Sequence, residues 1–340
     1  MSAFITRIDD SSQVAEARRK ARRLAQDLDF DDDAAERAAI VVTEVCTNLI
    51  KHAGSGQIMI GHSSGGASGL SHPDAWDRPA VLEILALDRG PGIVDVEESR
   101  EDGHSTTGTS GNGLGAIGRL SSYMEIYSRA GRGTAILARV SRRAGEILQP
   151  ANIGAVQAPK PGEEVCGDGW GETAAEGCRT FLMADGLGHG PDAARASTAA
   201  VDMLYKHSDL SLTELLAAVH DALRYTRGAA VAIAELDKER GTVAFGGLGN
   251  ICGTIVAEGF PPRRMVSTNG TAGAEARHIR QFTYPWTEGA ALVMHSDGIG
   301  THWSLSDYPG LSAHDPSLIA GVVYRDFSRG NDDATIMVAK

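Results

Sequence analysis

The chain has 340 residues, about twice the usual size of one domain, so two domains are expected. Its 42% hydrophobic and 22% charged residues are ordinary for folded proteins and exclude a mainly disordered chain. The net charge is −12 and both halves are acidic, which argues against nucleic acid or anionic lipid as a partner. We see no membrane-length apolar run and no export signal, so we expect a cytoplasmic protein without a membrane partner.

The first half predicts a mixture of helices and strands. A strand at residues 3–9 is followed by two helices, one from about Ser11 and one that begins at residues 31–33 and ends at Gly54. Two strands come next, separated by a polar, Gly/Pro-rich insertion at residues 62–79. A Gly-rich loop, a helix and two further strands complete this half.

The stretch between Ser141 and Pro161 predicts the boundary between the domains, because a strand-like run ends there and prolines follow. We therefore expect domains at residues 1–142 and 162–340, joined by a linker at 143–161. The second half alternates strands with two consecutive helices, then gives short strands, a late helix and a final strand. Both halves belong to the α+β class.

Three motifs of the first half carry chemistry. Glu44 and Asn48 are four residues apart on a predicted helix, so their side chains share one face and can supply a general base and an oxygen ligand for Mg²⁺. Asp88 follows an apolar run, which predicts a carboxylate at a strand end, and glycines at 90 and 92 follow it. Residues 111–116, Gly-Asn-Gly-Leu-Gly-Ala, open a helix whose free N–H groups can hold a phosphate.

The glycine run alone is similar to a dinucleotide-binding fingerprint, but that fingerprint directly follows a strand, and here a polar loop precedes it. The ordered set of three motifs instead resembles the GHKL (Bergerat-fold) ATP-binding family over about residues 1–140. Residues 43–54, TEVCTNLIKHAG, are most similar to anti-sigma-factor serine kinases of the RsbT/RsbW type. The resemblance implies an N-terminal GHKL α/β sandwich that binds ATP and Mg²⁺.

The same resemblance implies a role for each motif residue. Asp88 would accept a hydrogen bond from the adenine amino group, and Thr134 would lie near the adenine. Asn48 would hold Mg²⁺ on the phosphates, and Glu44 would deprotonate the acceptor serine. The hinge and lid, where the backbone approaches the nucleotide, would be formed by Gly90, Gly92, Gly111, Asn112, Gly113 and Gly115.

Four aspartates of the second half stand beside strand-like runs: Asp168, Asp185, Asp297 and Asp332. One Asp-Gly pair indicates only a turn, but four carboxylates in this order form an all-oxygen donor set suited to Mg²⁺ or Mn²⁺. Packed together without a metal, they would repel one another and their pKa values would rise.

The order of these four motifs resembles the metal-dependent (PPM) serine/threonine phosphatases over about residues 150–340. The segment DGLGHG at 185–190 is similar to the bacterial SpoIIE/RsbX branch. The resemblance implies a PPM-type α/β/β/α sandwich with two Mn²⁺ or Mg²⁺ ions. It also implies direct attack by a metal-bridging hydroxide on a phosphoserine or phosphothreonine.

By this resemblance Asp185 bridges both ions and the carbonyl of Gly186 contacts one of them. Asp297 and Asp332 bind the other ion, and Asp168 contributes through the same cluster. Asp333 remains an alternative to Asp332 as the ligand. The choice between Mn²⁺ and Mg²⁺ and the oligomeric state stay open.

The two halves together predict a bifunctional bacterial signalling regulator, with an ATP-dependent serine kinase and a metal-dependent phosphatase. By resemblance, its target is a serine or threonine of a STAS-domain anti-sigma antagonist or stressosome protein. One alternative is a partner-switching protein whose first half binds ATP and a partner, such as a sigma factor, and gates the phosphatase. Another is a phosphatase that its nucleotide domain activates without transferring phosphate.

Overall fold

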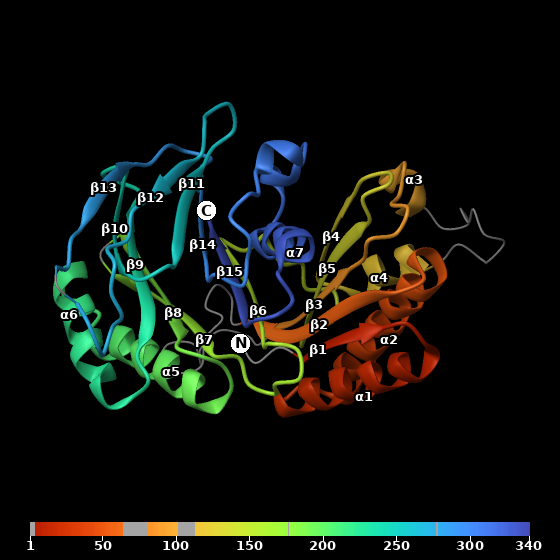
Figure 1. The fold of residues 1–340 in the computed structure, drawn as a ribbon. Coiled ribbons are helices and arrows are strands. Elements are labelled where there is room, and N and C mark those ends of the chain that lie inside the picture. Colours follow the sequence, from red (N-terminus) through yellow and green to blue (C-terminus); the bar gives the residue numbers. More distant parts are fainter. Residues whose placement is uncertain (1–3, 64–80, 101–112, 176, 277) are drawn as a thin grey trace. The chain divides into compact units, whose positions relative to one another are not determined.

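The computed structural model describes residues 4–63, 81–100, 113–175, 177–276 and 278–340 (Figure 1). The described residues group into two compact units. The first unit comprises residues 4–63, 81–100, 113–152 and 317–325. The second unit comprises residues 153–175, 177–276, 278–316 and 326–340.

The first unit is built on one antiparallel sheet with strand order β1-β2-β3-β5-β4. Helices α1 and α2 lie along one face of it (Figure 1). The strands are β1 (Phe4–Ile8), β2 (Gly56–Ser63), β3 (Val81–Leu87), β4 (Tyr123–Ser128) and β5 (Thr134–Ser141). The helices are α1 (Ser11–Asp27), α2 (Asp32–Asn48), the π-helix η1 (Leu49–Ala53), α3 (Val96–Arg100) and α4 (Gly113–Leu120).

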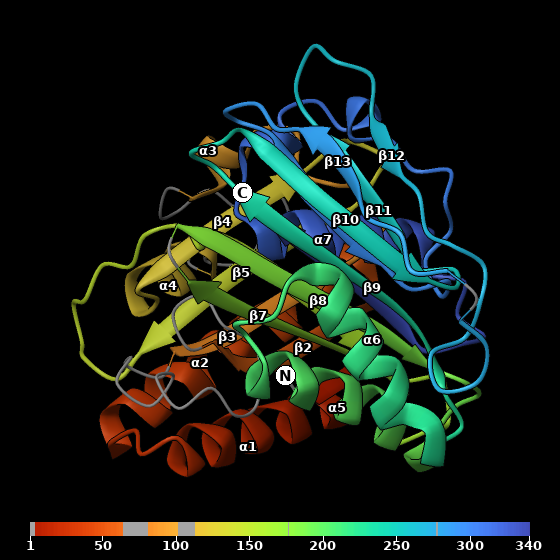
Figure 2. The ribbon, with the colours of Figure 1, turned by 90° about the vertical axis from the view of Figure 1, so that its left-hand side faces the viewer.

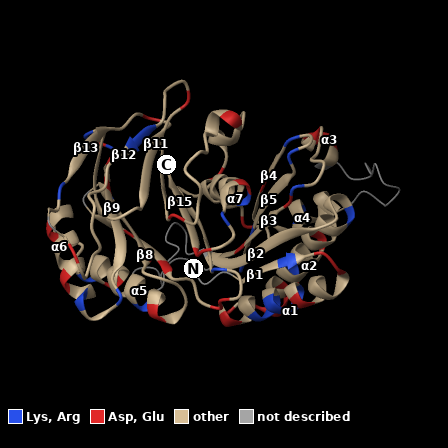
Figure 3. Ribbon diagram, in the orientation of Figure 1, with Lys and Arg blue, Asp and Glu red and all other residues tan. Residues whose placement is uncertain are grey.

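Small side chains let the two long helices of this unit pack closely. Helix α1 buries Ala17, Ala21 and Ala25, which are spaced four residues apart and therefore form one stripe. This stripe belongs to one core with alternate strand residues such as Ile58 and Ile84. Helices α1 and α2 carry many charged residues, whereas the neighbouring strands β2 and β3 carry almost none (Figure 3). The core thus forms between the helices and one face of the sheet.

Strands β3 and β5 are buried along their whole length, so the other face of the sheet is also covered. Residues 317–325 of helix α7 (Pro316–Phe327) belong to this unit. A Cβ placed on Gly321 would lie 2.8 Å from Cδ2 of Leu85, which shows that the helix approaches β3 closely. The predicted second domain, residues 162–340, includes this helix, whereas its residues 317–325 group with the first unit.

Glu83 and Arg139 form an ion pair beneath α7. They are direct cross-strand partners on β3 and β5, and Nε of Arg139 donates to Oε2 of Glu83 over 2.7 Å. The hydroxyl of Ser317 joins them, accepting from Nη2 of Arg139 and donating to Glu83, both over 3.2 Å. The Arg139 and Glu83 side chains are only 4% and 8% exposed, so each charge depends on the other for compensation.

We expect Glu83→Ala to lower the free energy of unfolding by about 3–5 kcal/mol, because it leaves the Arg139 charge buried without its partner. Chemical denaturation of purified protein measures this loss. Glu36→Ala is the matched control, since Glu36 pairs with Arg18 on the surface and exposed pairs contribute about 0–1 kcal/mol. Equal losses for the two variants would contradict the assigned importance of the buried pair.

The second unit contains two five-stranded antiparallel sheets. One has the order β13-β10-β9-β8-β7 and the other β12-β11-β14-β15-β6. The first of these sheets contains β7 (Asp168–Ala175), β8 (Cys178–Gly186), β9 (Ala229–Asp237), β10 (Thr242–Leu248) and β13 (Phe282–Pro285). The second contains β6 (Ile153–Ala158), β11 (Cys252–Val256), β12 (Arg263–Met265), β14 (Ala291–His295) and β15 (Ala334–Ala339).

Alternation along β8 explains the layers of this unit. Phe181 and Met183 point into a core shared with residues of β14 and β15, so the two sheets pack on each other. Leu182 and Ala184 point the opposite way, into a core shared with the helices. Figure 2 shows these helices, α5 (Pro191–Lys206) and α6 (Leu212–Ala222), in front of β8 and β9. Short 3₁₀ turns complete the unit at Leu223–Tyr225, Leu305–Asp307 and Leu311–Ala313.

The predicted linker at 143–161 contains a strand. Residues 153–158 form β6, which pairs with β15 from Ile153 opposite Ala339 to Ala158 opposite Ala334. The sequence does not predict this strand, because Gly and Ala residues and nearby prolines are typical of a loop. Its burial in the folded chain distinguishes it from one. The mixed helix and sheet content otherwise agrees with the predicted α+β class. Among the described residues, no helix is both long and apolar enough to span a membrane.

Candidate functional sites

Glu44 and Asn48 lie together at the first helical residue of α4. Both side chains are half-buried on the same face of α2. A Cβ placed on Gly113 would be 3.3 Å from Oε2 of Glu44 and 3.3 Å from Oδ1 of Asn48. The structure therefore brings a carboxylate and a carboxamide to the N-terminus of a helix, where anions are favoured. Gly115 lies further along α4, and Gly111 and Asn112 lie outside the described residues.

Asn48 also marks a change in helix type that the sequence does not predict. It is the last residue of α2, and the chain continues as the π-helix Leu49–Ala53 before ending at Gly54. Single π turns are rare in proteins, and those that occur are often at functional sites. The sequence pattern predicts one continuous helix up to Gly54. The structure agrees with a continuous helix, but its last turn, after Asn48, is the wider π type.

Asp88 lies directly after β3 and is held by backbone donors. Its Oδ1 accepts from the N–H groups of Gly90 over 2.8 Å and Thr134 over 3.1 Å. Burial raises the pKa of Asp88, and these two hydrogen bonds act against the rise. Oδ2 takes no part in these bonds. The hydroxyl of Thr134 is 2.9 Å from that of Ser128, so Asp88 and Thr134 are fixed beside each other.

The turn after Asp88 has no space for side chains. A Cβ on Gly90 would be 2.7 Å from Cβ of Ala53, so the turn approaches the end of the π-helix. Gly92 adopts φ of +73°, and a Cβ there would be 2.0 Å from the carbonyl oxygen of Arg129. Glycine is therefore required at position 92 by both conformation and contact.

We expect Gly92→Ala to destabilise the first unit by about 2 kcal/mol or more and to weaken nucleotide binding. The added methyl group cannot fit without moving the turn that positions Asp88. Gly131→Ala is the matched control, because Gly131 has the same φ of +73° and a Cβ added there would meet nothing within 4 Å. Denaturant unfolding and nucleotide titration calorimetry would separate the two. A loss no larger than that of Gly131→Ala would contradict the steric argument.

A second group of carboxylates gathers in the second unit. Asp168 begins β7 and stands directly opposite Asp185, near the end of β8, in the strand register. Like charges in this position repel. Asp297 follows β14, and the neighbouring Ser296 donates its hydroxyl hydrogen to Oδ2 of Asp168 over 2.7 Å. The ends of strands from both sheets thus meet around Asp168.

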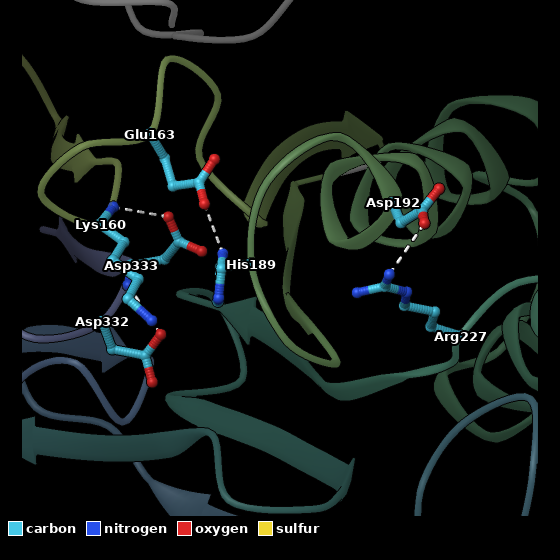
Figure 4. A network of polar contacts seen from close by, with 7 residues as sticks. All are labelled: Lys160, Glu163, His189, Asp192, Arg227, Asp332 and Asp333. Atoms are coloured by element: carbon cyan, nitrogen blue, oxygen red, sulfur yellow. Dashed lines mark hydrogen bonds and ion pairs between the residues drawn. The ribbon is translucent and has the colours of Figure 1, made fainter.

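Asp332 and Asp333 enter the same cluster just before β15. Oδ1 of Asp333 accepts from the backbone N–H of Lys160 over 2.8 Å, and Oδ1 of Asp332 accepts from the N–H of Asp333 over 3.0 Å (Figure 4). Within this cluster, Oδ1 of Asp168 and Oδ2 of Asp333 are buried and have no hydrogen-bond partner among the described residues. Unpartnered buried oxygens are costly, so they indicate a missing ligand.

The crowding of these carboxylates changes their protonation. Burial raises the pKa of Asp168 to about 7, and the charges of Asp333 and Asp297 add to the rise. Burial raises the pKa of Asp185 to about 8, with contributions from Asp168, Asp297, Asp332 and Asp333. A divalent cation would compensate these charges, and oxygen donors are the type that Mg²⁺ and Mn²⁺ prefer. Within the described ranges, no three acidic, histidine or cysteine side chains already enclose a metal position.

The structure is compatible with either Asp332 or Asp333 as the last metal ligand. Asp333 is 3% exposed and its Oδ2 lacks a partner, although its Oδ1 is occupied by Lys160. Asp332 is half-buried and contributes to the raised pKa of Asp185. The assignment of Asp332 over Asp333 therefore stays a prediction.

Gly186 closes the cluster on the side of helix α5. A Cβ there would be 2.1 Å from the carbonyl oxygen of Ala193, and its own N–H donates to Gly167 over 3.2 Å. Only glycine permits β8 to approach α5 this closely. The backbone of Gly186 therefore remains beside Asp185, where the prediction places a metal contact.

Sequence reasoning missed several residues that support these sites. The carboxamide of Asn250 donates to Oδ2 of Asp297 over 2.8 Å, and Ser296 holds Asp168. Nδ1 of His189 lies 2.5 Å from Oε1 of Glu163, which fixes the histidine by a carboxylate (Figure 4). These residues are common types far apart in the sequence, and the local signals for them, a turn histidine at 189 and a Gly-rich loop at 246–250, are equally typical of structural turns.

Comparison with known proteins identifies the first unit. The model of the histidine kinase-like ATPase domain family matches residues 9–140. The serine/threonine-protein kinase RsbT of Bacillus subtilis (strain 168) is 35% identical over 133 residues, which are 39% of this chain and 91% of that protein. The chain belongs to the RsbT family. Its first unit is thus a kinase-type ATP-binding domain, and the family implies ATP as its ligand.

The second half of this RsbT-family chain matches a different family. The model of stage II sporulation protein E (SpoIIE) matches residues 175–340. A solved chain described under the bacterial stressosome, a modular system adapted to control secondary messenger signalling, is 27% identical with a TM-score of 0.52. That match covers 56% of this chain and 98% of the solved one. The RsbT-type kinase domain is therefore joined to a domain that matches the SpoIIE family model.

Proposed function

We propose that this chain is a bifunctional cytoplasmic regulator that phosphorylates and dephosphorylates serine or threonine on STAS-domain proteins. The kinase homologue RsbT and the stressosome description of the solved relative support a target in a partner-switching or stressosome pathway. The two donor sets support separate chemistries, since each lies within its own compact unit.

In the kinase domain, we assign adenine recognition to Asp88, whose Oδ1 is fixed by two N–H groups while Oδ2 can accept from a ligand. Asn48 would hold Mg²⁺ through its carboxamide oxygen. Glu44, beside Asn48 at the start of α4, would take the proton from the acceptor hydroxyl. The phosphates would lie at the N-terminus of α4, and contacts of Gly111 and Asn112 with them stay a prediction for residues outside the described ranges.

In the phosphatase domain, two Mn²⁺ or Mg²⁺ ions would be held by Asp168, Asp185, Asp297, Asp332 and the carbonyl of Gly186. When bound, such ions lower the pKa of a water molecule and stabilise charge on phosphoryl oxygens. The chain's own residues orient this chemistry. Ser296 fixes Asp168, Asn250 fixes Asp297, and Asp168 itself is buried.

One observation carries the phosphatase assignment, namely that Asp168 and Asp333 bury carboxylate oxygens without hydrogen-bond partners at converging strand ends. A purely structural cluster would satisfy or protonate these oxygens, and its carboxylates would not need to face one another.

The test measures the intact mass of a purified STAS-domain protein after incubation with this chain. With ATP and Mg²⁺, we expect the unphosphorylated protein to gain one phosphoryl group. With Mn²⁺ and no nucleotide, we expect the phosphorylated protein to lose one. The absence of any mass gain across candidate STAS proteins would contradict the kinase half, and an unchanged phosphorylated mass would contradict the phosphatase half.

A second candidate function, nucleotide gating of the phosphatase, is favoured by the position of α7. Nη1 of Arg325 donates to the carbonyl oxygen of Asp88 over 3.1 Å, and Arg89 donates to the carbonyl of Arg325. Arg325 also precedes Asp332 by only seven residues in the chain. Phosphatase assays with a non-hydrolysable ATP analogue distinguish this function, because gating predicts a changed rate without phosphotransfer.

A further inference from the structure

A pocket in the second unit borders the carboxylate cluster. Its volume is about 770 Å³, which is in the range of ligand-binding clefts. The loop after β10, strands β11 and β12 and residues 301–304 line it. Asn250 belongs to this lining and donates to Asp297, so one wall of the pocket is shared with the predicted metal site.

Two exposed arginines lie at this pocket and along the segment that follows Asp297. Nη2 of Arg264 donates to the carbonyl of Thr301 over 2.9 Å, and the backbone N–H of Arg329 donates to Gly298 over 2.9 Å. The two residues thus hold opposite ends of the short segment 298–301. The guanidinium of Arg264 and the backbone of Arg329 therefore lie three residues apart along this segment, next to Asp297.

Neither guanidinium forms an ion pair with a carboxylate in the part of the chain that the structure describes. Of the two, Arg264 is the one that lines the pocket. A guanidinium that lines a pocket without a carboxylate partner favours an anionic ligand there, and Arg329 adds positive charge along the adjoining segment.

The surroundings of Arg264 fit a polypeptide ligand rather than a small ion. Strand β12, which contains Arg264, is at the edge of its sheet. Two large apolar side chains flank it in exposed positions, Phe260 at 63% and Val266 at 54%. Apolar contacts, an edge strand and positive charge together suit a protein segment with acidic side chains.

We propose that Arg264 and Arg329 form a subsite that binds an acidic side chain next to the phosphorylated residue of the protein substrate. The inference rests on the proposed phosphatase function. The phosphoryl group itself is assigned to the carboxylate-bound metal ions, so the arginines act on the flanking residues. They determine which phosphoserine segments the phosphatase accepts.

The test compares three substrates in Mn²⁺-dependent assays of the full chain. They are a phosphoserine peptide with flanking glutamates, the same peptide with glutamines, and p-nitrophenyl phosphate. For Arg264→Ala and Arg329→Ala, we expect KM for the glutamate peptide to rise about tenfold while kcat changes little. KM for the other two substrates should stay unchanged. Arg263→Ala is the matched control, because this neighbouring exposed arginine bonds to the carbonyl of Pro285.

Three outcomes would overturn the inference: an unchanged KM for the glutamate peptide, an equal rise for the glutamine peptide, or an equal rise for p-nitrophenyl phosphate. The last would show that the arginines bind the phosphoryl group itself. Wild-type activity on p-nitrophenyl phosphate separates the two claims, since its absence contradicts the proposed phosphatase, whereas its presence leaves only the subsite under test. Arg264→Lys, which keeps the charge, should recover part of the affinity.

Discussion

Asp185→Asn should reduce the metal-dependent phosphatase rate by more than about a hundredfold, since even residues that only support metal ligands usually contribute 10–100-fold. Asp185 stands opposite Asp168 and is influenced by each of the other cluster aspartates, so it is central to the donor set. Asparagine keeps the shape of the side chain and removes its charge. Release of phosphate from a phosphorylated STAS protein at saturating Mn²⁺ measures the loss, and an unchanged rate would contradict the metal assignment.

In the absence of metal, Asp185→Asn should stabilise the folded protein. The pKa of Asp185 is about 8 in the folded chain, raised from 3.8, so the folded state binds more protons between these values. The stability of the metal-free protein therefore falls as pH rises from about 4 to 8, and metal binding offsets the fall at the upper end. Asp185→Asn should raise the metal-free Tm at pH 8 and flatten its pH dependence. A lower Tm for this variant would contradict repulsion within the cluster.

Much of the fold could be predicted because periodicity and turn residues mark its elements. Helix α2 begins at the acidic residues 31–33, and β3 ends where the apolar run meets Asp88. Strand β6 could not be predicted, since its six residues, half of them Gly or Ala, gain their strand character from pairing with β15. Helix α7 is buried on nearly all sides, so its sequence cannot specify which sheet it covers.

In the candidate sites too, residues in local sequence motifs could be predicted, whereas their partners from distant segments could not. Asp168, Asp185 and Asp297 stand in short motifs whose strand-end position is legible in the sequence. Their supporting partners are not, because Ser296 reaches Asp168 across 128 positions of the chain and hydroxyl residues are abundant. Arg264 and Arg325 act through contacts between distant segments, and an arginine in isolation predicts only a solvated surface.

Glu44→Gln is expected to slow transfer of phosphate from ATP to the STAS protein by about 10²–10⁴-fold, the usual contribution of a general base. Glutamine preserves the side-chain volume next to Gly113 but cannot accept the proton of the acceptor hydroxyl. ATP affinity should change little, because Asp88 and Asn48 retain their positions. Single-turnover labelling with ATP and Mg²⁺ measures the rate, and calorimetric titration measures the affinity.

Two controls make this result specific to Glu44. Glu36→Gln alters a carboxylate on the same helix that pairs with Arg18 at the surface, and it should label at the wild-type rate. The Glu44→Gln variant should also keep full Mn²⁺-dependent phosphatase activity, because the carboxylates of that site lie in the other unit. If Glu44→Gln labels the STAS protein at the wild-type rate, Glu44 is not the base. If it loses ATP affinity as well, the carboxylate positions the nucleotide instead of taking a proton, and the slower labelling follows from weaker binding.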